Sequence, residues 1–394
     1  MSGPVSDKVL ASADRLDAWL VASGFKAYDP FDGLSSRVLG PFTLGQPLLR
    51  IALQQGIRRF PLNLRPFLGV PQGHSSKGMG FLARGYMRLH AATGDDRYAE
   101  RARMCLDWLI ENRSSGYTGA AWGNHFNYQS RVFFLPAGVP TIVWVALIGQ
   151  AFLDAYAYFG DQRYLDMAAS ACEHIVHDLD RHEDGDTVCI SYIPIDNKQV
   201  HNANVLGAGL LARVYALTGN EVYRDLAEKS AAYTVKYQRP DASWWYGEAS
   251  NLHWVDNFHT AYVLDSLKHY AEGSGDRSHD EAIDRGYRYW KDTFFEADGM
   301  PRYYDFQAKP LDIQCCSQAI DTLVFFNDRD PDSLELAAKV ADWTIANMQD
   351  RDGHFWFRRY PGGWINKTAT LHWGQATMMC ALGGLYRALE GGKW

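Results

Sequence analysis

The sequence has few cysteines, and none of them suggests a disulfide framework or a metal site. The six cysteines, at positions 105, 172, 189, 315, 316 and 380, form no CxxC pair and no ligand-like spacing with histidine. We interpret them as small buried residues of a reducing compartment, which predicts a cytoplasmic protein. The 13 histidines form no HExxH motif, so we expect no metal. A P-loop and a GxGxxG after a strand are also missing, and no cofactor is expected.

Long runs of one residue type are missing as well. There is no run of 18 apolar residues, so no membrane span is expected. The opening "MSGPVSDKVLASADRLDAWL" has no basic region followed by an apolar one, and reads as an amphipathic helix rather than a signal peptide. The formal net charge is -7, and lysine and arginine are scattered singly. This pattern argues against nucleic acid or an anionic membrane surface as a partner.

Aromatic residues, in contrast, are abundant. The chain has 22 Tyr, 19 Phe and 13 Trp, an aromatic share of 14%. Aromatic rings supply core area, and they also form flat platforms on which the faces of sugars stack. For any one tryptophan, a place in the core and a place in a sugar site are equal alternatives.

A repeated turn reveals how the chain is organised. The segments "TGDDRYAERA" at 93, "FGDQRYLDMA" at 159, "TGNEVYRDLA" at 218 and "SGDRSHDEAI" at 274 are versions of one element. In each, the glycine is expected to end one helix in a left-handed conformation, and the next residues start a second helix. The helix before the turn is apolar and the helix after it carries charge on one face. Each unit is therefore predicted to be a hairpin of an inner and an outer helix.

Two further units complete the pattern. A weaker fifth hairpin is "CSQAIDTLVFF" followed by "PDSLELAAKVADWTIANM", and the C-terminal helix in "TLHWGQATMMCALGGLYR" would be the inner half of a sixth. Its missing outer half can be supplied by the N-terminal helix 6–22. We predict an all-α fold: residues 1–394 as one (α/α)6 toroid of six helical hairpins, closed by the N- and C-terminal helices. An open solenoid and two separate bundles are the alternatives.

The loops that lead into the inner helices should converge on one rim of such a toroid. They are rich in Trp, Tyr, Asn, His and Asp, which is typical of a binding site for sugars. Glycosidic cleavage uses a pair of carboxyl groups. Asp256 in "HWVDNFHT" and Asp312 in "KPLDIQCC" are the candidate pair, although each can also be a helix cap. His125 and His259 are expected to assist.

The remaining candidates are polar or aromatic residues of the same loops, expected to contact a substrate through stacking, amide hydrogen bonds or a cation that holds a carboxylate. They are Trp122, Asn124, Tyr128, Gln129, Arg131, Asn202, Trp245, Trp254, Asn257, Gln314, Lys367, His372, Trp373 and Gln375.

Two segments resemble a known enzyme family. "LHWGQATMMCALGGLYR" and "WVDNFHTAYVLDSL" are similar to two helix starts of unsaturated glucuronyl hydrolases. The resemblance implies that Asp256 is the general acid/base and that Trp373 and Gln375 line the sugar subsite. Over nearly its whole length the chain also resembles bacterial proteins often encoded beside exopolysaccharide-synthesis genes, through "YDPFDGLSS", "LNLRPFLG" and "NKT…WGQA". Glucuronyl C5-epimerases are similar in fold.

Together these features predict a glycoside hydrolase acting on an acidic, uronic-acid-containing oligo- or polysaccharide. A uronate lyase, a C5-epimerase and a non-catalytic glycan-binding protein of polysaccharide assembly are the alternatives, because a fold does not decide a reaction. The oligomeric state stays open.

Overall fold

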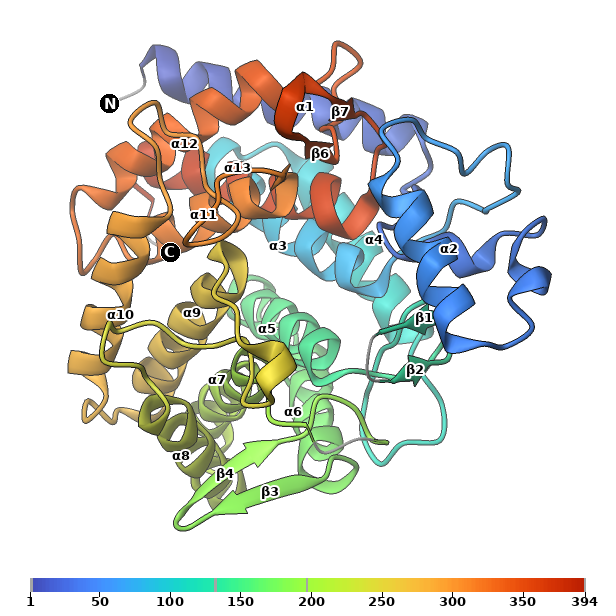
Figure 1. Cartoon of the computed structure of the whole chain (residues 1–394). Helices are drawn as coiled ribbons and strands as arrows, with labels where there is room; N and C mark the ends of the chain where they lie inside the picture. The colour runs from blue at the N-terminus through green and yellow to red at the C-terminus, as the bar shows by residue number, and fades with distance from the viewer. Residues whose placement is uncertain (1–2, 131–132, 196–197, 393–394) are drawn as a thin grey trace.

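A ring of six inner helices forms the centre of the molecule. The structure is a computed structural model that describes residues 3–130, 133–195 and 198–392. Each inner helix packs on the next, and the last packs on the first, which closes the ring (Figure 1). The fold prediction is confirmed. The inner helices are α3 (Ser76–Thr93), α5 (Ile142–Phe159), α7 (His201–Thr218), α9 (Asn257–Ser274), α11 (Ile313–Phe325) and α13 (Thr377–Leu389).

Six outer helices cover the inner ring, one for each hairpin. The N-terminal helix packs against α13 and α12, so it takes the place predicted for it as the missing half of the sixth hairpin. Its Ser12 hydroxyl donates to Gln349, and the Tyr86 hydroxyl of α3 donates to Asp17. The outer helices are α1 (Pro4–Ala22), α4 (Asp96–Glu111), α6 (Gln162–His177), α8 (Glu221–Lys236), α10 (Asp280–Thr293) and α12 (Ser333–Met348).

The repeated turns have the predicted geometry. Gly94, Gly160, Gly219 and Gly275 follow the ends of α3, α5, α7 and α9 with φ values of 69°, 71°, 70° and 75°. This left-handed conformation is open to glycine at little cost. These turns reverse the chain in the same way after each of the four inner helices, and residues from the first turns of α3, α5, α7 and α9 meet on one rim.

One inner helix is long and apolar enough to pass as a membrane span by length and composition. It is α5, with a mean hydropathy of 1.5 over Ile142–Phe159. In the structure 67% of this window is buried, because α5 packs between α3 and α7 and under α6. A buried core helix has the same composition as a spanning one.

The segment between α1 and α3 was not predicted as helical. It contains two short 3-10 helices, η1 (Asp32–Ser35) and η2 (Gly40–Thr43), and the helix α2 (Pro47–Arg59), which lies outside the ring beside β1 (Figure 1). Small strands complete the rim: β1 (Tyr128–Gln129) with β2 (Phe134–Leu135), β3 (Arg181–Asp184) with β4 (Thr187–Ile190), and β5 (Leu311–Asp312) with β6 (Arg358–Arg359) and β7 (Ile365–Asn366). The other short helices are η3 (Ser250–Leu252), η4 (Pro361–Gly363) and η5 (Leu371–Ala376).

Candidate active site

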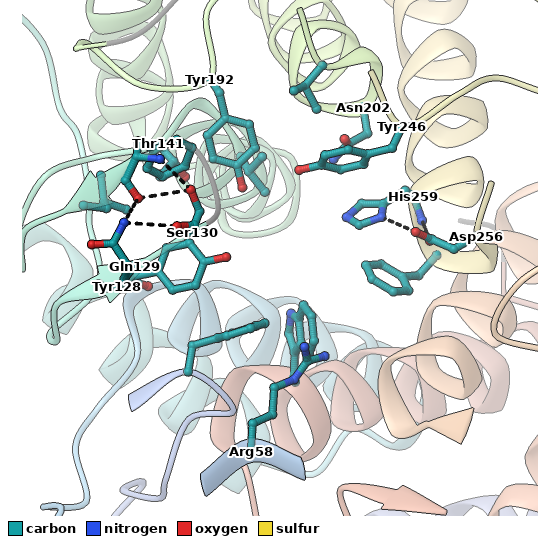
Figure 2. A pocket seen from close by; sticks show the side chains of 18 of the residues that line it. Arg58, Tyr128, Gln129, Ser130, Thr141, Tyr192, Asn202, Tyr246, Asp256 and His259 are labelled. Atoms are coloured by element: carbon teal, nitrogen blue, oxygen red, sulfur yellow. Dashed lines mark hydrogen bonds and ion pairs between the residues drawn. The ribbon is translucent and has the colours of Figure 1, made fainter. Parts of the chain in front are cut away.

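A cavity of about 620 Å³ lies on the rim where the inner helices begin. Its wall includes residues from the first turns of α3, α5, α7 and α9, from η5, and from the unpredicted helix α2. Aromatic rings and polar groups alternate around it (Figure 2). Of the predicted site residues, the wall contains Asn124, Tyr128, Gln129, Asn202, Trp254, Asp256, His259, His372 and Trp373.

Asp256 and His259 form a hydrogen-bonded pair at the start of α9 (Figure 2). Asp256 is the N-cap of this helix, and its Oδ1 accepts from the His259 backbone N–H at 3.0 Å. Its Oδ2 lies 2.7 Å from Nδ1 of the His259 ring and accepts from the Trp254 indole at 3.0 Å. With Asp256 as acceptor, the ring proton sits on Nδ1, which leaves Nε2 to accept a proton. The carboxylate is both a cap and the orienting partner of a base.

Three tyrosines line the same cavity as this pair, and one of them, Tyr246, lies beside it. The Tyr246 ring stacks on Trp254 at 4.5 Å between centroids and lies 4.6 Å from the His259 ring. The side chains of Tyr128, Tyr192 and Tyr246 point into the same cavity (Figure 2). Burial raises the pKa of Tyr192 and of Tyr246. Their hydroxyl groups therefore stay protonated at neutral pH and can donate to sugar oxygens.

A second histidine and carboxylate pair, Asp29 with His372, lines the cavity from another side. Nδ1 of His372 lies in direct contact with Oδ2 of Asp29, and the two side chains are each 2% exposed. Burial alone would raise the pKa of Asp29, but His372 and the Phe31 amide outweigh it, and the net pKa is lowered. Burial lowers the pKa of His372. The pair is best described as a carboxylate and a neutral imidazole.

The stretch around His372 reaches the cavity through an irregular turn. Residues Leu371–Ala376 form η5, a π-type turn with non-helical angles at Trp373 and at Gly374, whose φ is 154°. A side chain at this φ is strongly disfavoured, and a Cβ on Gly374 would come within 3.0 Å of the Thr370 hydroxyl. The turn directs His372 and Trp373 to the cavity wall.

Lys77 is a cation that sequence reasoning passed over. It lies in the first turn of α3, lines the cavity, and is 3% exposed. Its ammonium lies 5.1 Å from the Trp144 ring, 5.5 Å from Tyr262 and 5.7 Å from Phe81. Burial lowers the pKa of Lys77 to about 7, although Asp29 acts against this. At neutral pH Lys77 can therefore accept or donate a proton.

Arg58 is a second cation in the cavity wall, and it comes from α2 (Figure 2). Its guanidinium lies 4.4 Å from the Phe31 ring and 5.5 Å from the Trp373 ring. Burial and the neighbouring Arg358 lower the pKa of Arg58. An anion bound in the cavity would stabilise the charged form of Arg58 against burial and against the repulsion of Arg358. Arg58 is therefore placed to hold a carboxylate.

Asp312 does not take the place expected for a second catalytic carboxylate. It is fully buried and absent from the cavity wall. Arg358 holds it with two hydrogen bonds, one of them 2.7 Å from Nη2 to Oδ2, and Arg58 Nη2 lies 3.5 Å from the same oxygen. A carboxylate bound to two arginines is held in place and is not available to a substrate. The expectation of an Asp256 and Asp312 pair facing one cavity is thus corrected.

Trp122 and three amide residues of the expected site are structural instead. Trp122 is buried against Phe152, and its indole donates to the Leu109 carbonyl. Each of the three amides is buried and bonded to neighbouring protein groups: Asn257 to the Arg302 carbonyl, Gln314 to the Tyr262 hydroxyl, and Gln375 to both backbone groups of Phe355.

Three other candidates lie outside the cavity wall. His125 packs against Phe126 and closely over Gly73. Trp245 stacks on His253, with ring centroids 4.9 Å apart. Lys367 lies over the Trp356 ring and 3.9 Å from Asp350. The prediction for Arg131 lies outside the described residues.

No protein-family model matches the chain, and no curated protein matches it. Solved structures do. A cellobiose 2-epimerase from Bacillus thermoamylovorans matches with a TM-score of 0.62 at 12% identity, over 80% of this chain and 88% of the epimerase. The unsaturated glucuronyl hydrolase from Bacillus sp. GL1 matches with a TM-score of 0.62 at 14% identity, over 96% of both chains.

A polysaccharide lyase also matches, with a TM-score of 0.58 at 13% identity, over 96% of this chain and 98% of the lyase. These three proteins carry out different reactions on sugars. The likeness shows the (α/α)6 fold, and the reaction has to be argued from the site.

Proposed function

We propose that the chain is an enzyme that modifies an acidic glycan by proton transfer at a uronic acid residue, as an epimerase or a lyase does. The pairing of Asp256 with the cavity-facing His259 carries the proposal. A histidine oriented by a carboxylate is a general base, and its Nε2 is the atom left to act. The similarity to sugar epimerases, glucuronyl hydrolases and a polysaccharide lyase agrees with a glycan substrate.

The charges of the cavity favour an acidic sugar. Among its described wall residues there are two carboxylates, Asp29 and Asp256, each in contact with a histidine. The same wall contains four side chains of basic residues, Arg58, Arg59, Lys77 and Lys198. The N-terminal ends of inner helices also point at this rim, and helix N-termini attract anions. A uronate carboxylate is the anion that a sugar brings into such a site.

The proposed reaction begins with the substrate carboxylate held by Arg58. Arg58 neutralises the charge of the carboxylate, which makes the hydrogen on the adjacent C5 more acidic, and His259 Nε2 takes that proton. In an epimerase a second group then delivers a proton to the opposite face of C5. In a lyase the electron pair instead forms a C4–C5 double bond and the C4 oxygen leaves with its substituent. Tyr246 beside His259, and Lys77 elsewhere in the cavity wall, are groups that can supply a proton.

Hydrolysis is the second candidate, because Asp29 and Asp256 both line the cavity. In that case Asp29 would have to replace Asp312 in the two-carboxylate scheme. The pairing of Asp29 with His372 makes it a less available acid than a free carboxyl group.

The test is incubation with a panel of glucuronate- and mannuronate-containing polysaccharides in deuterated water. Deuterium at C5 of the product indicates an epimerase. Ultraviolet absorbance of an unsaturated product indicates a lyase. New reducing ends without either signal indicate a hydrolase. The substitutions His259→Gln and Asp256→Asn should each lower turnover by about 10²–10⁴-fold, the usual contribution of a general base. Substrate affinity should change much less.

His253→Gln is the matched control, since this histidine stacks on Trp245 outside the cavity wall. It should leave turnover unchanged. New reducing ends in a product that carries no deuterium at C5 would contradict the proposed proton transfer and would support hydrolysis. Equal loss of binding and turnover in His259→Gln would contradict its role as a base.

A further inference from the structure

The outer face of the segment around α2 is unusually apolar. Nine of the seventeen large hydrophobic side chains that are exposed in the described residues fall between positions 38 and 67. The most exposed are Phe67 at 82%, Leu48 at 80%, Leu44 at 78% and Phe42 at 72%. We call this set the α2 patch: Val38, Leu39, Phe42, Leu44, Leu48, Leu49, Phe60, Leu62 and Phe67.

The members of the α2 patch are held together by the packing of their short elements. Helix α2 packs against η1 and η2, which carry the flanking loops. The Val38 amide donates to the Leu68 carbonyl at 3.4 Å, and the Ser36 hydroxyl donates to the same carbonyl at 2.7 Å. These bonds bring the two ends of the segment side by side. Figure 1 shows the segment projecting from the ring of helices.

The charge of this segment has one sign. No aspartate or glutamate occurs from Gly33 to Gly94, although the whole chain is acidic. Arg37 and Arg59 are exposed next to the patch, and Arg50 is half-buried. Apolar side chains beside arginines, with no acidic group among them, match the chemistry of an anionic lipid surface.

A second copy of the chain fits less well. A two-fold interface places the same patch on both sides, so the arginines of one copy would face those of the other. No carboxylate of the segment could separate them. A membrane surface and a second copy of the chain would both bury the apolar side chains. The positive charge of the segment favours the anionic membrane surface.

We infer that the α2 patch docks the protein on an anionic membrane surface. Phe42, Leu44, Leu48 and Phe67 enter the boundary between headgroups and acyl chains, and the neighbouring arginines contact lipid phosphates. The other face of α2 lines the cavity through Ile51, Gln55 and Arg58. Docking therefore brings the cavity close to the membrane, within reach of a glycan displayed there.

The test is flotation with vesicles of phosphatidylglycerol and phosphatidylcholine in equal amounts, compared with phosphatidylcholine alone. The whole protein should bind the anionic vesicles and be released by salt. The double substitution Leu48→Ser and Phe67→Ser should weaken this binding by about tenfold or more, because it removes two large inserting side chains. Arg37→Gln, at an arginine outside the cavity wall, should weaken it on anionic vesicles only.

The matched control is Leu217→Ser with Val222→Ser, which removes two exposed apolar side chains at the α7–α8 turn. It should bind like the natural protein. No flotation with anionic vesicles would overturn the inference, as would equal loss in the control. A dimer in solution that Leu48→Ser and Phe67→Ser convert to a monomer, without vesicle binding, would assign the patch to a second copy.

Discussion

Lys77 is a buried lysine, and burying its charged form lowers the stability of the folded protein. Its ordinary pKa is 10.5, and burial lowers the pKa in the folded protein to about 7. Between these pH values the unfolded chain binds one more proton than the folded one, so the free energy of unfolding rises with pH over this window. Below about pH 7 the lysine is charged in both states, and the cost of burying that charge is complete.

Lys77→Met should therefore raise the free energy of unfolding by a few kcal/mol at about pH 6 and by less at about pH 9. Denaturant unfolding at both pH values measures this difference. Lys229→Met, at a side chain 45% exposed, is the control and should show no such pH dependence. An equal effect at both pH values would mean that the pKa of Lys77 is not lowered.

Asp312 is expected to be a structural carboxylate, and a substitution separates this role from a catalytic one. Asp312→Asn leaves Arg358 and Arg58 buried without their counter-ion. We expect a loss of about 3–5 kcal/mol in the free energy of unfolding and a raised KM, because Arg58 loses its anchor. The kcat should be largely retained.

Arg358→Gln breaks the same ion pair from the other side and should reproduce the loss of stability. Urea unfolding and steady-state kinetics measure the two effects. A collapse of kcat with unchanged stability would restore Asp312 as a catalytic residue.

Sequence reasoning located some site residues and missed others for a physical reason. Asp256, His259 and His372 directly precede or begin inner helices, and the repeat fixes where those helices begin. Lys77 occupies the same kind of position, but "SSKGMG" contains nothing that marks a lysine as buried. Arg58 comes from a segment outside the repeat, so no pattern placed it near the cavity. Whether Lys77 and Arg58 reach the cavity depends on burial and on contacts between distant parts of the chain. The spacing of neighbouring residues in the sequence does not show either property.

At the scale of elements, the π-type turn η5 is the part of the site with the most unusual backbone. Gly374→Ala should strain this turn, since φ is 154° and the added Cβ meets the Thr370 hydroxyl. We expect a loss of about 1–3 kcal/mol in stability. We also expect a marked fall in turnover, because His372 and Trp373 shift from the cavity wall.

Gly94→Ala is the comparison, because that glycine has a positive φ but open space around it. It should lower stability with turnover unchanged. Thermal unfolding and turnover of both variants separate the two effects. Normal turnover in Gly374→Ala would show that the turn does not position the site.

Hairpins were predictable from the sequence because the glycine turn recurs, whereas α2 was not. The hairpin helices carry the periodicity and caps that local chemistry requires. Helix α2 exposes Leu48 and Leu49, so its apolar residues do not mark a buried face. The acid-free stretch was also hidden, since the net charge of the whole chain averages over it. The net charge of all 394 residues does not show that one segment of the chain has no acidic residue.

At the scale of the whole molecule, the two ends of the chain meet. Ser6 of α1 is hydrogen-bonded to Glu390 just after α13. A circular permutant of these 394 residues that joins residue 394 to residue 1 by a short glycine linker and opens the chain between Gly219 and Asn220 should fold, because that turn is exposed. Its free energy of unfolding should lie within about 2 kcal/mol of the natural value.

A second permutant, opened between Gly207 and Ala208 inside the buried helix α7, is the control and should fail to fold. Circular dichroism with denaturant unfolding compares the two. Failure of the first permutant would mean that ring closure requires the natural order of the helices.

The position of α1 also affects how the protein is made. Within this chain α1 is made more than 300 residues before its packing partners, α12 and α13. The apolar side of α1, which includes Val9, Leu16 and Leu20, therefore has no partner until these two helices have been synthesised. The nascent chain must keep this helix from aggregating during that interval. We expect premature termination before α12 to yield products that depend strongly on chaperones.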